Sequence, residues 1–318
     1  MRFLWPYKIV SSTNELELMK NIQSILLLIF VLTLFSSIVS CDKVDDPYEG
    51  VLVSACERIP GAVNIWGDTA NVTVKKMIIE EITGHTCGNC PPKTALIIDW
   101  VDNDYKNQVY SVAFHATSFA NPVRGYPADF RTEKGTELND KLQNTSAPVA
   151  IFNRTDLNGT GLLVGGGKFN LEFEKLINNG ALDKPRIQLK LHNQYDETNN
   201  LTQLSITGSA LEDLAGDFTL IIYVLEDKII SDQKYYGFPA GDHITDFEHR
   251  HMFRDAIGSL DGNAFISKEL NKGEKVEKCF SYSIDSNWNI YNCVYLVAVK
   301  DNSTGEIIQS DEIHASNQ

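Results

Sequence analysis

The fold is decided by the stretch Val72-Thr-Val-Lys-Lys-Met-Ile-Ile-Glu-Glu-Ile82, which runs directly into Thr83-Gly-His-Thr-Cys87-Gly-Asn-Cys90-Pro-Pro92. The first part is rich in β-branched residues, which predicts a strand. The two closing prolines suit the first turn of a helix, where no N–H donor is needed. Apolar residues between Lys93 and Tyr105 then recur with helical spacing. The sequence therefore predicts a strand, a loop that carries two cysteines, and a helix.

The segments that follow continue the alternation of strands and helices. They predict a strand, a polar helix, a strand opened by a proline, a short strand and a last helix: Gln108–Phe114, Asp129–Leu142, Val149–Phe152 after Ala147-Pro148, Leu162–Val164 and Asn170–Leu182. Alternating β and α units are typical of an α/β layer fold. We therefore expect an α/β domain over residues 72–183.

From Pro185 onward the pattern changes to short runs that alternate apolar and polar residues with period two. These runs are Arg186–His192, Leu201–Gly208, Phe218–Leu225, Val276–Ile284 and Val294–Val299. Clusters of Asn, Asp and Gly separate them, and short strands with such punctuation predict a β-sandwich. We expect an all-β, immunoglobulin-like sandwich over residues 184–318, with the domain boundary near Asp183-Lys-Pro185.

The N-terminus carries the features of an export signal. An apolar run from Ile25 to Phe35 follows Met19-Lys20, and it is shorter than the roughly 20 apolar residues of a membrane span. A basic start, a short apolar core and a small-residue exit make up a secretory signal. We therefore interpret residues 1–40 as a signal peptide whose true start is Met19. Residues 41–71, rich in turn formers, are then a tether and an irregular lead-in.

The exit of this signal, Ile38-Val-Ser-Cys41, resembles the bacterial lipobox. The resemblance implies that Cys41 becomes the new N-terminus and is diacylated, which would anchor the protein in a membrane. An ordinary signal peptide with an incidental cysteine is the alternative. The acidic stretch Asp42–Pro47 resembles the tethers of Bacteroidetes lipoproteins that are sorted to the outer membrane and often displayed on the cell surface. A solvated tether without sorting content is the alternative for this stretch.

The order of elements in residues 72–182 resembles thioredoxin, with the two cysteines at the first strand-to-helix junction and a proline before the hairpin. The resemblance implies that Cys87 is the attacking thiol and Cys90 the resolving thiol of disulfide exchange. It also implies that Glu81 is a buried carboxylate that relays a proton to Cys90, and that Pro148 is a cis-proline facing the dithiol. The alternatives are a surface charge at Glu81 and an edge-strand start at Pro148.

Two departures from thioredoxins alter the expected site. Thr86 stands where thioredoxins usually carry tryptophan, and Gly88-Asn89 replaces Gly-Pro between the cysteines. We still expect Cys87 to be exposed and acidic and Cys90 to be buried, because the two prolines after Cys90 draw it under the helix. A permanent structural disulfide is the main alternative to an exchanging one.

The remaining cysteines lie outside this motif. The chain has six cysteines, and an export signal takes them to a compartment where disulfides persist. Cys279 and Cys293 occupy two β-rich runs with the loop Asp285–Asn289 midway between them, so a hairpin would set them opposite each other. We therefore predict a structural disulfide between Cys279 and Cys293, and Cys56 has no assigned partner.

Metal and cofactor sites are not predicted. A zinc site built on the two motif cysteines would need a second pair of ligands, and no second Cys-x-x-Cys pair occurs. His249 and His251 would share one strand face, but on their own they do not complete such a site. We therefore expect neither a metal nor another cofactor.

The lipobox, the segment Ile79–Pro91 and the C-terminal strands together resemble a Bacteroidetes family, the “Omp-twenty-eight-related” outer membrane lipoproteins. His249-Arg-His-Met-Phe-Arg254 is similar to a His-x-His segment in the second domain of that family. The resemblance implies a location in the outer membrane, with the cell surface as one option. It says little about the chemistry of the protein.

Two functions fit these features. The first is thiol–disulfide exchange with envelope proteins at Cys87 and Cys90, and the second is a non-catalytic surface lipoprotein that binds a partner protein and holds a structural disulfide there. Whether the protein is an enzyme stays open. Its 28 basic and 42 acidic residues give a net charge of −14, which argues against nucleic acid as a partner. The expected partners are the membrane, through the lipid on Cys41, and envelope or surface proteins.

Overall fold

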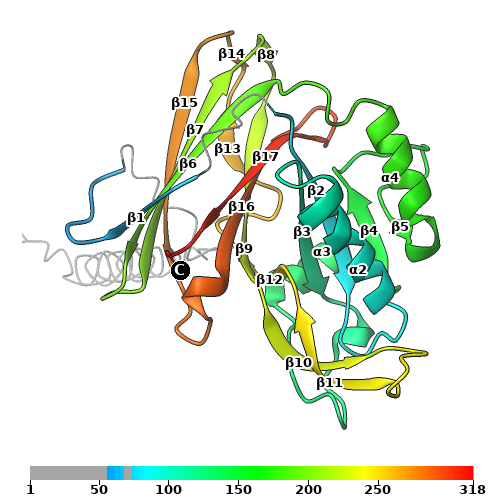
Figure 1. Cartoon of the computed structure of the whole chain (residues 1–318). Coiled ribbons are helices and arrows are strands. Elements are labelled where there is room, and N and C mark those ends of the chain that lie inside the picture. The colour runs from blue at the N-terminus through cyan, green and yellow to red at the C-terminus, as the bar shows by residue number, and fades with distance from the viewer. Residues whose placement is uncertain (1–55, 68–73, 318) are drawn as a thin grey trace, which may run out of the picture. The chain divides into compact units, whose positions relative to one another are not determined.

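The computed structural model describes residues 56–67 and 74–317 of the chain (Figure 1). The described residues form three α-helices and a larger number of strands. The helices are α2 (Pro91–Asp99), α3 (Glu133–Lys141) and α4 (Phe169–Asn178). A nine-stranded mixed sheet and a four-stranded antiparallel sheet hold most of the strands. The described part of the protein is thus a mixed α/β structure dominated by strands. None of its helices is long and apolar enough to cross a membrane.

The nine-stranded sheet combines strands from both predicted halves of the chain. Its order is β17-β16-β9-β12-β3-β2-β4-β5, and β13 pairs with β9 beside this path. The first half contributes β2 (Met77–Thr83), β3 (Val109–His115), β4 (Val149–Phe152) and β5 (Val164–Gly165). The second half contributes β9 (Phe218–Glu226), β12 (Met252–Ala256), β13 (Asn263–Ile266), β16 (Cys293–Asp301) and β17 (Ile307–His314).

The elements of the first half follow one another in the predicted order, from β2 and α2 through β3, α3, β4 and β5 to α4. Every residue of β2 is buried, because packed side chains cover both faces of the strand. Ile78 belongs to the same core cluster as Leu138 of α3, whereas Ile79 belongs to the cluster that holds Ile97 of α2 and Phe173 of α4. This burial on two faces explains why the sequence of the strand is a nearly continuous apolar run.

The four-stranded sheet has the order β1-β6-β7-β15; three of its strands come from the second half, and β1 comes from the segment predicted to be an irregular lead-in. Its strands are β1 (Val63–Trp66), β6 (Ile187–Asp196), β7 (Leu201–Ala210) and β15 (Lys275–Ser283), and β8 (Leu214–Ala215) pairs separately with β14 (Glu269–Leu270). One core cluster joins Leu189 on β6, Ile206 on β7 and Phe280 on β15 to Ile222 on β9 and Val297 on β16. The two sheets therefore share a core, filled by the inward residues of the period-two strands predicted from the sequence.

The two predicted halves meet in the middle of the nine-stranded sheet. β12 pairs with β3 in parallel at Met252 and Ala113, and the Ala113 N–H donates a hydrogen bond of 2.9 Å to the His251 carbonyl. A buried ion pair of 2.6 Å also joins Lys76, just before β2, to Asp311 on β17. Hydrogen bonding between strands thus continues without a break from one half of the chain to the other.

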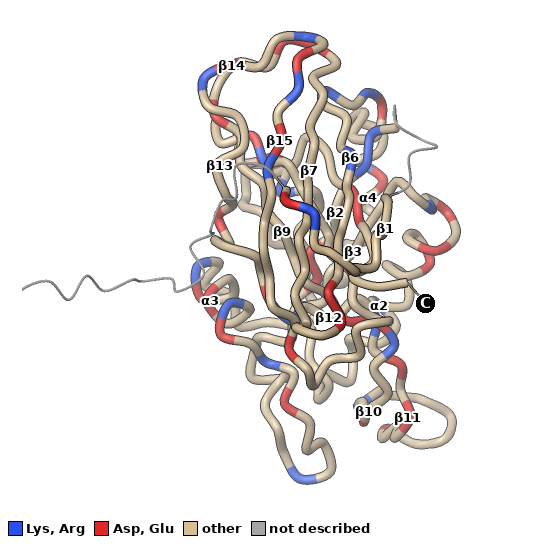
Figure 2. The backbone as a smooth tube through the Cα atoms, turned by 90° about the vertical axis from the view of Figure 1, so that its left-hand side faces the viewer, with Lys and Arg blue, Asp and Glu red and all other residues tan. Residues whose placement is uncertain are grey.

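A hairpin that the sequence analysis did not predict projects from the second half. We call residues 229–249 the β10–β11 arm, formed by β10 (Ile229–Lys234) and β11 (His243–His249). The two strands pair antiparallel with each other and form a sheet of their own. In two views at right angles the arm lies at the lower end of the molecule (Figure 1, Figure 2), on the side of α2 in the first.

Candidate dithiol site

The two motif cysteines lie in the loop between β2 and α2 and form a disulfide, with their Cα atoms 5.4 Å apart. Cys90 is the residue that precedes the first turn of α2, and Pro91 and Pro92 open the helix. The Cys90 carbonyl accepts hydrogen bonds from the N–H groups of Lys93 and Thr94 at 2.8 and 2.9 Å. The helix therefore begins at Pro91, directly after Cys90 and not after Cys87, as the two prolines led us to expect.

The predicted exposure of Cys87 is wrong. Cys87 is 2% exposed and Cys90 is 1% exposed, so both sulfur atoms are buried. The β10–β11 arm supplies contacts to this loop, because the N–H groups of Lys234 and Tyr236 donate hydrogen bonds of 2.8 Å to the carbonyls of His85 and Gly88. No pattern in the sequence indicates that residues so distant in the chain lie on the cysteine loop.

Glu81 lies on β2 and is buried, which answers the question that the sequence left open. Its carboxylate accepts a hydrogen bond of 2.8 Å from the Thr94 hydroxyl, and Thr94 is bonded through its backbone to Cys90. Loss of hydration on burial raises the pKa of Glu81 to about 7. A carboxyl group with this pKa is able both to accept and to release a proton near neutral pH.

Pro148 precedes β4, and the pairing of Val149 with Ile82 places it beside the end of β2, where the cysteine loop begins. The Ala147–Pro148 peptide bond is cis, in agreement with the expectation from the sequence. The Pro148 carbonyl accepts a hydrogen bond of 3.0 Å from the N–H of Gly166. Its role toward a substrate stays a prediction.

Three buried histidines, His85, His115 and His249, adjoin the dithiol, and the sequence analysis had not associated His115 or His249 with it. The ring of His115 lies 6.2 Å from that of His85 and 5.4 Å from that of His249. Burial lowers the pKa of His115 well below its usual range and that of His249 to about 4, so both rings are neutral at pH 7. His115, His249 and Cys90 line a cavity of about 10 Å³, room for one water molecule.

Topology could have pointed to one of these histidines. His115 ends β3, and it pairs in parallel with Thr83 at the end of β2. Because neighbouring parallel strands end at the same edge of a sheet, a histidine at this position is placed next to the loop that follows β2. The predicted shared strand face of His249 and His251 is wrong, because β11 ends at His249 and His251 has a left-handed backbone with φ of 47°.

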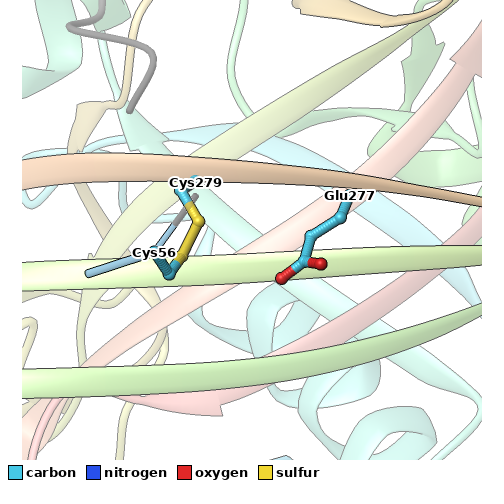
Figure 3. A group of neighbouring side chains, drawn as sticks. All are labelled: Cys56, Glu277 and Cys279. Carbon is cyan, nitrogen blue, oxygen red and sulfur yellow. A yellow bond between two sulfur atoms is a disulfide. The ribbon is translucent and has the colours of Figure 1, made fainter. Parts of the chain in front are cut away.

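The predicted Cys279–Cys293 disulfide is also wrong. Cys279 is bonded to Cys56, with a Cα–Cα distance of 5.5 Å (Figure 3), and Cys293 is a free, buried cysteine. The reason is that β15 and β16 do not form a hairpin: β15 pairs with β7 in one sheet, and β16 pairs with β9 and β17 in the other. Burial raises the pKa of the Cys293 thiol to about 12, which keeps it protonated.

A carboxylate lies next to this second disulfide. The Glu277 carboxylate and the sulfur atoms of Cys56 and Cys279 lie within 4.8 Å of one another (Figure 3). Glu277 accepts a hydrogen bond of 2.9 Å from the Ser205 hydroxyl. Because the two sulfur atoms are bonded to each other, neither is a thiolate ligand in this state. Cys41, the predicted lipid site, lies outside the described residues.

Comparisons with known proteins find one family. The family described as outer membrane protein Omp28 matches residues 137–316, more than half of the chain. A crystallised domain of the outer membrane lipoprotein Omp28 from Porphyromonas gingivalis is 15% identical, with 42% of this chain and 91% of that chain covered. Its TM-score of 0.27 is too low to carry an argument about the fold. No curated protein matches the chain. The family match begins after both motif cysteines, so it does not bear on their chemistry.

Proposed function

The chain belongs to the Omp28 family of outer membrane proteins, and from that premise we propose that it is a lipid-anchored protein that exchanges disulfides with other envelope proteins. Its outer membrane location, predicted from the sequence, is confirmed by the family. We interpret β2 to α4 as a thioredoxin-like arrangement and the strands from β6 onward as an immunoglobulin-like sandwich. The order of elements and the core shared by the two sheets support this interpretation.

One observation carries the proposal for exchange: a buried carboxyl group, Glu81, is linked through Thr94 to a Cys-x-x-Cys disulfide at the start of a helix. Its pKa of about 7 suits it to take a proton from a thiol and return it at neutral pH. A purely structural disulfide does not require a neighbouring proton acceptor such as the Glu81 carboxyl. Burying a carboxyl group without an ion-pair partner also costs free energy. The sequence spacing alone did not distinguish these cases.

The proposed reaction uses the two cysteines in turn. In the reduced protein the Cys87 thiolate attacks the disulfide of a partner, which forms a mixed disulfide and releases the first partner thiolate. Cys90 then gives its proton to Glu81 and attacks the Cys87 sulfur, which releases the second partner thiolate. The partner disulfide is reduced by two electrons, and the Cys87–Cys90 disulfide forms. The reverse sequence oxidises a partner dithiol.

The proposed anchor is a lipid on Cys41, because a lipobox-like exit ends the apolar run of the signal peptide. Mass spectrometry of the mature N-terminus tests this. We expect a chain that begins at Cys41 and carries acyl groups. An unmodified chain that begins at another residue would refute the anchor and leave the dithiol proposal unaffected.

The alternative function is a non-catalytic lipoprotein that binds a partner while Cys87–Cys90 stays a structural disulfide. The observation in its favour is the burial of both sulfur atoms, which are 2% and 1% exposed. A disulfide of this kind has a reduction potential below about −300 mV, whereas exchanging pairs lie between about −120 and −270 mV. Measurement of the potential in the purified protein therefore separates the two functions.

A trapping experiment tests the exchange directly. Cys90→Ser leaves the Cys87 thiol without a resolving partner, so we expect mixed disulfides with envelope proteins on non-reducing gels. Cys87→Ser should give none, and the double variant is the matched background. If both single variants behave alike and the potential is below about −300 mV, the exchange proposal fails.

A further inference from the structure

We propose that the β10–β11 arm is a displaceable cover over the Cys87–Cys90 disulfide, and that it occupies the place of an extended segment of the partner polypeptide. The inference rests on the proposed exchange function and adds the way in which a partner gains access. A partner disulfide must approach a sulfur atom in line. Cys87 is 2% exposed, so the exchange requires that something move away from it first.

Two backbone hydrogen bonds join the arm to the cysteine loop. Lys234 and Tyr236, two residues apart on the arm, donate N–H hydrogen bonds of 2.8 Å to the carbonyls of His85 and Gly88. Donors at alternate residues also occur where an extended peptide adds to a free backbone edge, and here the second donor, Tyr236, lies in the turn that follows β10. Thr86 lies between the two acceptors in sequence, but it does not bond the arm through its N–H group. That N–H donates a hydrogen bond of 3.0 Å to the Phe119 carbonyl. The cysteine loop thus presents carbonyl groups that the arm satisfies.

Side chains of the arm complete the cover. The Gln233 amide donates hydrogen bonds of 3.2 Å to the Cys87 carbonyl and 2.7 Å to the Lys234 carbonyl. The Tyr236 ring lies directly on Gly88, where an added Cβ atom would stand 2.5 Å from the ring. The arm therefore covers the cysteine loop with backbone hydrogen bonds and with the Tyr236 ring.

The rest of the arm has features that allow it to move away from the cysteine loop. β10 and β11 pair only with each other among the described strands and join neither large sheet. Ile230 is 58% exposed, Tyr236 is 50% exposed, and Phe238 is 37% exposed. An isolated two-stranded hairpin is marginally stable, and regions with few buried apolar contacts open at a fraction of the free energy of global unfolding. The arm can thus move without disrupting either large sheet.

The same contacts define the kind of partner. Displacement of the arm frees the carbonyls of His85 and Gly88 beside the disulfide. A protein segment in extended conformation supplies N–H groups at the required spacing, whatever its side chains. A cysteine or a disulfide in that segment would then face Cys87. The partner class is therefore a cysteine-containing polypeptide strand rather than a small thiol.

Two variants with matched controls test the cover in the full-length protein. Lys234→Pro removes the N–H that bonds the His85 carbonyl, and its control Lys234→Ala keeps that N–H. Tyr236→Ala removes the ring that lies on Gly88, and its control Phe238→Ala removes a neighbouring exposed ring. The measured quantity is the rate at which reduced glutathione reduces the Cys87–Cys90 disulfide. Loss of one such contact should raise the rate about tenfold, since tenfold corresponds to about 1.4 kcal/mol. Lys234→Ala also removes the ammonium that lies 4.7 Å from the centre of the Tyr236 ring, so the effect of the lost N–H is the ratio of the rate in Lys234→Pro to the rate in Lys234→Ala. Phe238→Ala should stay within about twofold of the wild type.

The outcomes separate the cover from the exchange function. Equal rates in all four variants would overturn the cover. Faster reduction in Lys234→Pro and Tyr236→Ala, combined with no trapped partner in Cys90→Ser, would keep the cover and refute the exchange. For the partner strand, we expect the double variant Lys234→Pro/Cys90→Ser to trap more envelope protein than Cys90→Ser alone. An equal or smaller yield would overturn displacement by a polypeptide.

Discussion

At the scale of single residues, two adjacent carboxyl groups on β2 are buried in different surroundings. Glu80 accepts hydrogen bonds of 2.7 and 2.9 Å from the Arg154 guanidinium and one of 2.6 Å from the Tyr223 hydroxyl. Glu81 is bonded by the neutral Thr94 hydroxyl, and burial raises its pKa to about 7. A cation therefore stabilises the charge on Glu80, whereas the surroundings of Glu81 favour its protonated form.

We predict that Glu81→Gln stabilises the protein at pH 8 but not at pH 4.5. A carboxyl group with a raised pKa stabilises the folded state fully below its unfolded value of 4.5, and this contribution is lost as the pH rises through about 7. Glutamine cannot ionise, so the variant escapes that loss. A shift of this size corresponds to about 3 kcal/mol in the free energy of unfolding at pH 8. Urea unfolding at the two pH values measures the difference.

Glu80→Gln is the matched control, because the same substitution is made one residue earlier. It weakens the partner of the buried Arg154 guanidinium, so we expect a loss of about 3 kcal/mol. The loss should be present at pH 8, where Glu81→Gln gains stability. If Glu81→Gln were no more stable than the wild type at pH 8, the assignment of a raised pKa would be wrong.

At the scale of elements, the Cys56–Cys279 disulfide ties the segment before β1 to β15 across a sequence separation of 223 residues. We predict that Cys56→Ala lowers the free energy of unfolding by about 2–5 kcal/mol, because so long a closed loop restricts the unfolded chain. Urea unfolding checks the magnitude. Peptide mapping without reduction should find residues 56 and 279 in one cross-linked product.

Cys293→Ala serves as the control for this element. Cys293 is buried and free, so its removal should leave the cross-linked product intact. In the wild-type protein, a product that joins residues 279 and 293 would instead support the hairpin pairing inferred from the sequence and contradict the Cys56–Cys279 disulfide.

Elements formed by local sequence were predictable, whereas their distant partners were not. The helix that begins at Pro91 and the strand Val109–His115 follow from nearby residues, and the structure has both. Alternation predicted β15 and β16 but could not show that they lie in different sheets. The short β10–β11 arm has no pattern that assigns it to the cysteine loop, which is why the exposure of Cys87 was predicted wrongly.

At the scale of the whole molecule, buried polar contacts join the two halves of the chain. Lys76 is paired with Asp311 at 2.6 Å, and Arg154 donates a hydrogen bond of 2.8 Å to the Tyr223 hydroxyl. Composition and periodicity predicted two domains with a boundary near residue 183, and that boundary stays a prediction. What they could not predict is that β3 and β12 would pair in one sheet, because a parallel neighbour leaves no local mark on a strand.

We predict that the two halves unfold in one cooperative transition. An ion pair between Lys76 and Asp311 and the pairing of β3 with β12 join the two halves, so we expect neither half to be stable alone. Hydrogen exchange at increasing urea concentration should give the same midpoint for peptides from β2 and β16. Lys76→Met should shift both midpoints together by the same amount. Two separated midpoints, or a shift confined to β2 and β3, would contradict a single cooperative unit.

The pairing of β3 with β12 also matters while the protein is being made. Export delivers the N-terminal part of a chain first, so β3 would reach the envelope before β12. During that interval β3 is an edge strand of valine, tyrosine and phenylalanine with unpaired backbone groups, a template to which other chains can add. Pairings between residues so distant in sequence also form slowly. β3 therefore stays open to pairing with other chains for as long as β12 is absent.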